Sequence, residues 1–271
     1  MLYIKKVYID TRFKTPDSKS DSDFFIELPR SLNVPEDTIC YITDIVIPVS
    51  WSTVGENNNK LYVCVQRNST RVYKKMSLVA KNYDGITFAD ALHVLLNTEL
   101  TGIASFEVSY LLSDNEITIK QVSNFDAWVY LVSGADLQSG VYWDPPLPKA
   151  SIQSLNGVLR LGKNTYKLQE NLPYISSIDL HTIRNLYITS SSLASYNIIS
   201  NFDNDVIIKK VPVKAGYSTI LYDSADAGYD FLDVSRRALT RIDFRLQDSY
   251  GNIVNLRNNH WSFSLIFQKR S

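Results

Sequence analysis

The chain has 271 residues, which is long enough to bury a hydrophobic core without metal ions or disulfide bonds. Lysine and arginine together number 28, as do aspartate and glutamate, so no excess charge indicates a nucleic-acid or membrane partner. The 17 tyrosines and 11 phenylalanines, beside two methionines, favour β-strands, where aromatic and branched side chains pack well.

The two cysteines, Cys40 and Cys64, are too few for a disulfide framework, although a single bridge between them stays open. They are typical of folding in a reducing compartment. Residues 1–9 alternate charged and apolar side chains and lack the apolar core of a signal peptide. No apolar run approaches the roughly 20 residues that cross a bilayer. We therefore expect the protein to be made and kept in the cytoplasm or nucleus of its host.

The N-terminal part shows period-two alternation, which is typical of half-buried antiparallel strands. The predicted strands cover residues 3–9, 23–28 and 38–49. Prolines separate these runs, because proline cannot donate to a β-ladder. In the third run, uninterrupted alternation predicts that Ile39, Tyr41, Ile45 and Ile47 share one face.

The middle of the chain combines shorter predicted strands with one helix. The strands cover residues 60–66, 72–79, 105–111 and 116–122. We expect the helix to begin at Thr87 as its N-cap, with Asp90 at the capping-box position, and to run to Leu100. A second, weaker helix is predicted over residues 154–161, ending at Gly162, and the proline-rich residues 143–148 are predicted to be an extended connector.

Five further strands are predicted after the middle segment, over residues 183–190, 206–213, 219–223, 240–247 and 261–267. The last alternates most clearly, since Trp261, Phe263, Leu265 and Phe267 line one side. Three strands before the middle segment and five after it match the eight strands, B to I, of a jelly roll. We therefore predict an all-β-dominated chain: a single jelly roll of residues 1–56 and 176–271, with residues 57–175 inserted between strands D and E as a β-rich subdomain containing one helix.

Side chains that could carry catalysis or bind a metal show no recognisable spacing. The three histidines, His93, His181 and His260, are far apart and match no zinc motif. No GxSxG elbow marks a nucleophilic serine, and Cys64 stands in an apolar run that favours a buried, inert thiol. We predict no catalytic residues, no cofactor, no metal site and no enzymatic activity.

Three other segments have some features of ligand sites. Residues 157–164 approach a phosphate-binding P-loop, but Asn164 stands where a hydroxyl is required, and the interior of the segment is apolar. Carboxylates gather at Asp223, Asp226, Asp230 and Asp233, and again at Asp203 and Asp205, without the spacing of an EF-hand. Solvated loops explain both clusters better than calcium binding.

Nine short phrases along the chain carry a family resemblance: VYIDTR (7–12), DFFIELP (23–29), IVIPVSW (45–51), NNKLY (58–62), NLYITS (185–190), IIKKVPV (207–213), FLDVS (231–235), FRLQD (244–248) and SFSLIF (262–267). Together, in this order, they resemble the phrases of penton proteins, the capsid vertex proteins of Polinton-like elements and virophages. The resemblance is densest in the two end regions. It implies a structural protein of the virion that forms homopentamers at the fivefold vertices of an icosahedral capsid, beside a double jelly-roll major capsid protein.

Two other functions remain open from the residues alone. A trimeric jelly-roll module of the tumour-necrosis-factor kind would share the strand count, although such proteins are normally secreted or membrane-anchored. A carbohydrate-binding β-sandwich would use exposed aromatic platforms, which the tyrosine content allows. Particle mass separates five copies from three, and a glycan array tests the third function.

Overall fold

The computed structural model describes residues 4–124, 126–149, 152–193, 206–224 and 231–270. The chain divides into two compact units. The first consists of Met1–Trp51 with Ile183–Ser271, and the second, Ser52–Thr182, is inserted into it. Within the described part of the chain, no helix has the length and apolar character needed to span a bilayer.

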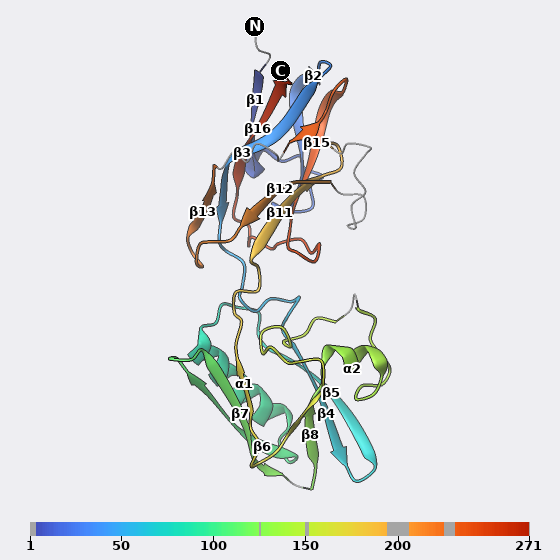
Figure 1. The fold of residues 1–271 in the computed structure, drawn as a ribbon, viewed down its shortest axis with the longest axis vertical. Helices are drawn as coiled ribbons and strands as arrows, with labels where there is room; N and C mark the ends of the chain where they lie inside the picture. Colours follow the sequence, from blue (N-terminus) through green and yellow to red (C-terminus); the bar gives the residue numbers. More distant parts are fainter. Residues whose placement is uncertain (1–3, 125, 150–151, 194–205, 225–230, 271) are drawn as a thin grey trace. The chain divides into compact units, whose positions relative to one another are not determined.

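Two antiparallel sheets form the first unit (Figure 1). One contains β1 (Ile4–Asp10), β16 (Ser262–Lys269), β3 (Thr38–Pro48) and β13 (Ile220–Asp223) in that order, and the two-residue β14 (Leu232–Asp233) also pairs with β3. The other contains β12 (Val206–Pro212), β11 (Asn185–Ser190), β15 (Ala238–Gln247) and β2 (Asp23–Asn33). A short 3-10 helix, Thr11–Phe13, follows β1.

The strand orders are those of a jelly roll. When β1, β2, β3, β11, β12, β13, β15 and β16 are lettered B to I, the sheets read B-I-D-G and F-E-H-C. The first and last strands pair antiparallel, as strands B and I do in a jelly roll, with Tyr8 opposite Ser264 and Ile9 opposite Phe263. Each of the eight ranges predicted to be strands contains one. The additional strand β14 has only two residues, which is too short to show an alternating pattern. The second unit lies in the chain between β3 and β11, the D and E strands.

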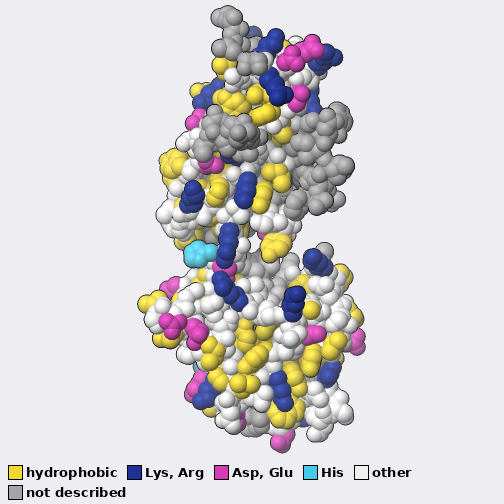
Figure 2. All heavy atoms as spheres, in the orientation of Figure 1, with side chains coloured by type: hydrophobic (Ala, Val, Ile, Leu, Met, Phe, Trp, Pro, Cys, Tyr) yellow, Lys and Arg dark blue, Asp and Glu magenta, His cyan; other side chains and the backbone are white. Residues whose placement is uncertain are grey.

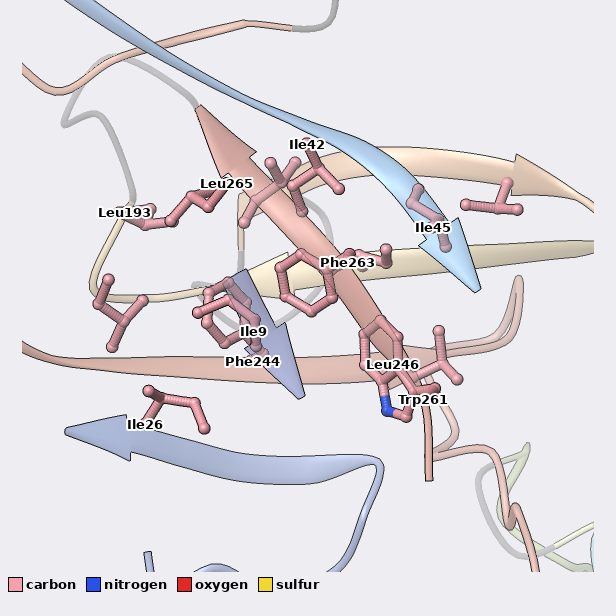
Figure 3. Close-up of a cluster of buried hydrophobic side chains, with 14 of the residues drawn as sticks. Ile9, Ile26, Ile42, Ile45, Leu193, Phe244, Leu246, Trp261, Phe263 and Leu265 are labelled. Atoms are coloured by element: carbon pink, nitrogen blue, oxygen red, sulfur yellow. The ribbon is translucent and has the colours of Figure 1, made fainter. Parts of the chain in front are cut away.

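The core of the jelly roll lies between the two sheets. Figure 3 shows Ile9, Ile42, Phe263 and Leu265 from one sheet facing Ile26, Phe244 and Leu246 from the other. Phe263, Leu265 and Phe267 are at most 2 % exposed, so the inward face predicted for the last strand is confirmed. The edge of Phe24 meets the ring of Trp261 at 5.8 Å, and the Trp261 indole donates to the Asp21 carbonyl at 2.6 Å.

A β-bulge in β3 makes one sequence prediction wrong. Thr43 and Val46 pair with Ser264 and Ser262, so two residues of β3 oppose the single residue Phe263. Asp44, at φ 51°, takes the left-handed conformation that such a bulge requires. The bulge shifts the alternation, so that Cys40 and Ile42 point into the core together with Ile45 and Ile47. Ile39 and Tyr41 therefore lie on the outer face.

The second unit has its own hydrophobic core around one helix. Helix α1 (Gly85–Glu99) buries Phe88, Leu92 and Leu96 against two sheets. One sheet contains β10 (Tyr174–Ser177), β7 (Glu116–Asn124) and β6 (Ala104–Leu111), and the other contains β5 (Thr70–Ser77), β4 (Lys60–Arg67), β8 (Trp128–Leu131) and β9 (Tyr166–Leu168). A short helix, α2 (Gly134–Ser139), was not foreseen from the sequence.

The predicted cap of α1 is wrong by one turn. Asp84 is the N-cap, and its carboxylate accepts from the Thr87 amide at 2.8 Å. The Thr87 hydroxyl in turn accepts from the Asp84 amide at 3.0 Å, which completes a capping box in which Thr87 is the third helical residue. Asp90 has no part in it. Both Asp and Thr are favoured at an N-cap, so the sequence allowed either start.

Two other segments of the second unit also differ from their predictions. The helix predicted over residues 154–161 is a series of turns, which ends with Arg160 in a left-handed conformation at φ 51°. Leu155 and Leu159 are nevertheless buried, which explains their helix-like spacing. Residues 143–148 are not an extended connector. Trp143 packs its ring edge-on against Tyr62 at 4.9 Å inside the second unit.

Candidate assembly surfaces of the jelly-roll unit

The side chains singled out for chemistry do not come together in the structure. His93 is exposed on α1, His181 is exposed before β11, and His260 lies 3.3 Å from the Asp21 carboxylate in the jelly roll. The described residues hold no group of three or more His, Cys, Asp or Glu side chains that could bind a metal. The expectation of no catalytic, cofactor or metal site stays a prediction.

Both cysteines are free and buried. Burial raises the pKa of the Cys40 thiol and that of the Cys64 thiol, so neither forms a thiolate readily. In residues 157–164, which approach the P-loop pattern, Val158 and Leu159 are buried in the core of the second unit. Asp223 and Asp233 lie in β13 and β14, whereas Asp203, Asp205, Asp226 and Asp230 lie outside the described residues.

The outer surface of the five-stranded sheet carries tyrosine and branched aliphatic side chains. Tyr8 and Tyr222 are 77 % and 72 % exposed on the edge strands β1 and β13, and Ile4 and Ile220 beside them are 55 % and 52 % exposed. Because directly opposed residues share a face, the pairing of Tyr222 with Val46 and of Ile266 with Tyr41 extends this surface across β3 and β16. We call it the tyrosine face: Ile4, Tyr8, Ile39, Tyr41, Val46, Ile220, Tyr222 and Ile266.

Charged side chains on and beside the tyrosine face pair with one another. Lys6 donates to the carboxylate of Asp44 at 2.7 Å, and its ammonium also lies 5.1 Å from the centre of the Tyr8 ring. Asp10 accepts from the Arg12 guanidinium at 2.6 Å, and these bonds hold the pKa of Asp10 below its ordinary value. The Asp44 bulge is thus what places a carboxylate within reach of Lys6.

The outer surface of the other jelly-roll sheet, which contains β12, β11, β15 and β2, carries charged side chains instead. Arg241 pairs with Asp17 and lies over the Phe25 ring at 4.0 Å, and Arg245 lies 3.5 Å from Asp23. Further residues share this side of the sheet by register. We call the set the charged face: Asp23, Phe25, Glu27, Tyr187, Ile207, Lys210, Arg241 and Arg245.

Asp243 is a buried carboxylate that anchors the chain after β11. It is 5 % exposed and accepts from the amides of Ser191 and Ser192 at 2.9 and 2.7 Å, and from the Ser191 hydroxyl at 2.8 Å. Burial alone would raise the pKa of Asp243, but the hydrogen bonds from the Ser192 and Ser191 hydroxyls and amides outweigh it and lower that pKa.

Over the molecular surface in view in Figure 2, positive and negative side chains are scattered among hydrophobic ones. The distribution does not form the continuous basic stripe by which nucleic-acid-binding proteins hold phosphates on that surface. The features that stand out are the two chemically different outer faces of the jelly roll. Alternation along the sequence predicts that Tyr8 points away from the core when Ile9 points into it. It cannot predict that the outer side of this sheet remains exposed.

No protein-family model matches the chain, and no curated protein matches it. Among solved structures, the mavirus penton protein is similar over 100 % of both chains, with a TM-score of 0.54 and 11 % identity. A chain from the Sputnik virophage structure is also similar, with a TM-score of 0.43 and 13 % identity over 97 % of this chain and 98 % of that one. The jelly roll and the unit inserted between its D and E strands thus have the fold of the mavirus penton protein.

Proposed function

We propose that this chain is a capsid vertex protein, a penton that forms homopentamers at the fivefold vertices of an icosahedral particle. The observation that carries the proposal is the likeness to the mavirus penton protein, which covers the full length of both chains and therefore includes the inserted unit as well as the jelly roll. A likeness limited to the jelly roll would have been compatible with many functions, because that fold serves many proteins.

The chemistry of the chain supports a structural role. Its histidines are dispersed, its thiols are buried, and its two outer jelly-roll faces differ in character. A closed ring larger than a dimer needs two different contact surfaces on each subunit, and the jelly roll offers such a pair. The zero formal net charge avoids accumulating repulsion when five copies come together.

The partners in this proposal are further copies of the chain and a double jelly-roll major capsid protein, which would surround the ring in the virion. No enzymatic step, cofactor, membrane or specific nucleic acid is part of it. An inserted second part between the D and E strands belongs to this proposal; its limits, predicted as residues 57–175 with 1–56 and 176–271 around them, are tested against the wider unit Ser52–Thr182.

The proposal is tested by producing the chain together with the major capsid protein and solving the particles by cryo-electron microscopy with local fivefold averaging. Five copies of this fold at each vertex are expected. A trimer of this chain in the particle, or particles whose vertices are filled by another protein, would remove it. Native mass spectrometry of the isolated protein adds the copy number of any soluble ring.

A further inference from the structure

The tyrosine face leaves large apolar side chains in solvent on both edge strands of its sheet. Four of its side chains, Ile4, Tyr8, Ile220 and Tyr222, are each more than half exposed. The largest exposed apolar patch on a protein is often a functional one, and such patches mark interaction surfaces. Tyrosine is also enriched at protein interfaces, because it buries a large ring while its hydroxyl still finds a hydrogen-bond partner.

A partner that covers the tyrosine face would not leave Lys6 or Asp10 buried without an ion-pair partner. Lys6 and Asp10 already have their partners, Asp44 and Arg12, on the same subunit. A buried charge that has lost its partner costs several kcal/mol of free energy. An ion pair that stays intact costs less when solvent is removed from it. In the middle of the face the small Ser264 and the buried Ile266 add no projecting charge, since they are 2 % and 7 % exposed.

The occupant cannot be the same face of another copy if the assembly is a ring of five. Two identical faces packed together generate a twofold axis and stop at a dimer, whereas a larger ring needs a different face on the neighbour. The charged face belongs to the opposite sheet of the same sandwich, so each subunit can present one face to each neighbour. Its cations Lys210 and Arg241 match tyrosine rings, and the chain already places Lys6 over Tyr8 and Arg241 over Phe25.

We propose, resting on the vertex function above, that the tyrosine face of each subunit packs on the charged face of the next subunit in the ring. Four strands about 4.8 Å apart and some seven residues long give a face on the order of 400 Å². A standard interface needs about 800 Å² from each partner. This contact alone therefore makes a weak ring, which the surrounding capsid completes.

The test uses two full-length variants and their mixture, followed by analytical ultracentrifugation over a concentration series up to the millimolar range. One variant, Tyr8→Arg with Tyr222→Arg, disrupts only the tyrosine face. The other, Ile207→Asp with Lys210→Glu, disrupts only the charged face, at exposed positions of β12. Tyr250→Arg is the matched control, because Tyr250 is 84 % exposed in the β15–β16 connection, outside both faces. Circular dichroism checks that each variant is folded.

Wild type and the Tyr250 control are expected to form pentamers, and each face variant is expected to raise the dissociation constant by at least about tenfold. When the two face variants are mixed, one intact tyrosine face and one intact charged face remain, so the mixture should form one-to-one heterodimers and nothing larger. This result is specific to a head-to-tail contact.

Two outcomes overturn the inference. Pentamers that persist in either face variant would show that the ring uses other surfaces, and the vertex function would stand. A wild-type chain that remains monomeric at every concentration would show that these faces do not hold copies together. The vertex function would then rest on the copy number at the fivefold positions of the particle, which is measured separately.

Discussion

The ring of Tyr110 in β6 lies directly over Gly85 at the start of α1. A Cβ atom placed on Gly85 would come within 2.1 Å of the Tyr110 ring, which is closer than atoms can approach. The Tyr110 hydroxyl donates to the Asn115 side chain at 2.9 Å, so the ring is held at both ends. The helix can therefore approach β6 this closely only because residue 85 has no side chain.

From this contact we expect Gly85→Ala to lower the free energy of unfolding by about 1 to 3 kcal/mol, because one extra methyl group overpacks the site. Urea titration measures the change. Gly134→Ala is the control, since no atom lies within 4 Å of a Cβ at that position, and its stability should not fall. In a Tyr110→Ala background the Gly85→Ala penalty should vanish, and a penalty that persists there would assign the effect to the backbone rather than to the ring.

Leu265 tests the core of the jelly roll. It is completely buried between the sheets, so Leu265→Ala should cost roughly 2 to 5 kcal/mol through lost burial and the cavity left behind. Ile220→Ala on the tyrosine face, where the side chain is 52 % exposed, should change monomer stability little. Chemical denaturation at concentrations where the chain is monomeric measures the free energy of unfolding of both variants. A loss near zero for Leu265→Ala would contradict a core between the two sheets.

Asp243 makes part of the stability dependent on pH. Its pKa in the folded protein is lowered, so its contribution is present above the ordinary aspartate value of about 3.9 and is lost as the pH falls through the folded value. Asp243→Asn should cost about 1 to 3 kcal/mol at pH 7, because it removes charged hydrogen bonds to buried donors. The difference from wild type should shrink in acid. Chemical denaturation at several pH values measures the stability difference between Asp243→Asn and wild type, and Asp114→Asn at an exposed position is the control. A stability difference that does not change with pH would argue against a charged Asp243 holding Ser191 and Ser192.

The limits of the inserted unit can be tested with two fragments. Val54 and Ile178 are buried in the core of this unit, at 0 % and 2 % exposed, but lie outside residues 57–175. A fragment of residues 52–182 should therefore unfold cooperatively and be more stable than a fragment of residues 57–175. Hydrogen exchange of the α1 amides reports the difference, and equal protection in both fragments would favour the shorter limits.

The regular strands could be predicted from the sequence, and the local irregularities could not. Residues 261–267 alternate without interruption, and β16 buries Phe263, Leu265 and Phe267 as expected. In β3 the same rule fails at Asp44, because a bulge depends on one backbone conformation that alternation does not encode. Leu155 and Leu159 show the converse error, since helical spacing also arises when separate turns face one core. The tyrosine face was missed because alternation identifies two sides of a strand but not which neighbour, if any, covers the outer one.

The order in which the chain is made has a consequence for the jelly roll. Among the residues that the structure describes, β1 pairs only with β16 and β2 only with β15, so both wait for strands at the far end of the chain. The inserted unit, by contrast, is complete once residue 182 has left the ribosome. Because domains generally fold as units during synthesis, the insertion should be folded while β1, β2 and β3 are still without their partner strands. Unpaired strand edges are prone to aggregate, so we expect the yield of the protein in a cell to depend on translation speed and chaperone supply as well as on native stability.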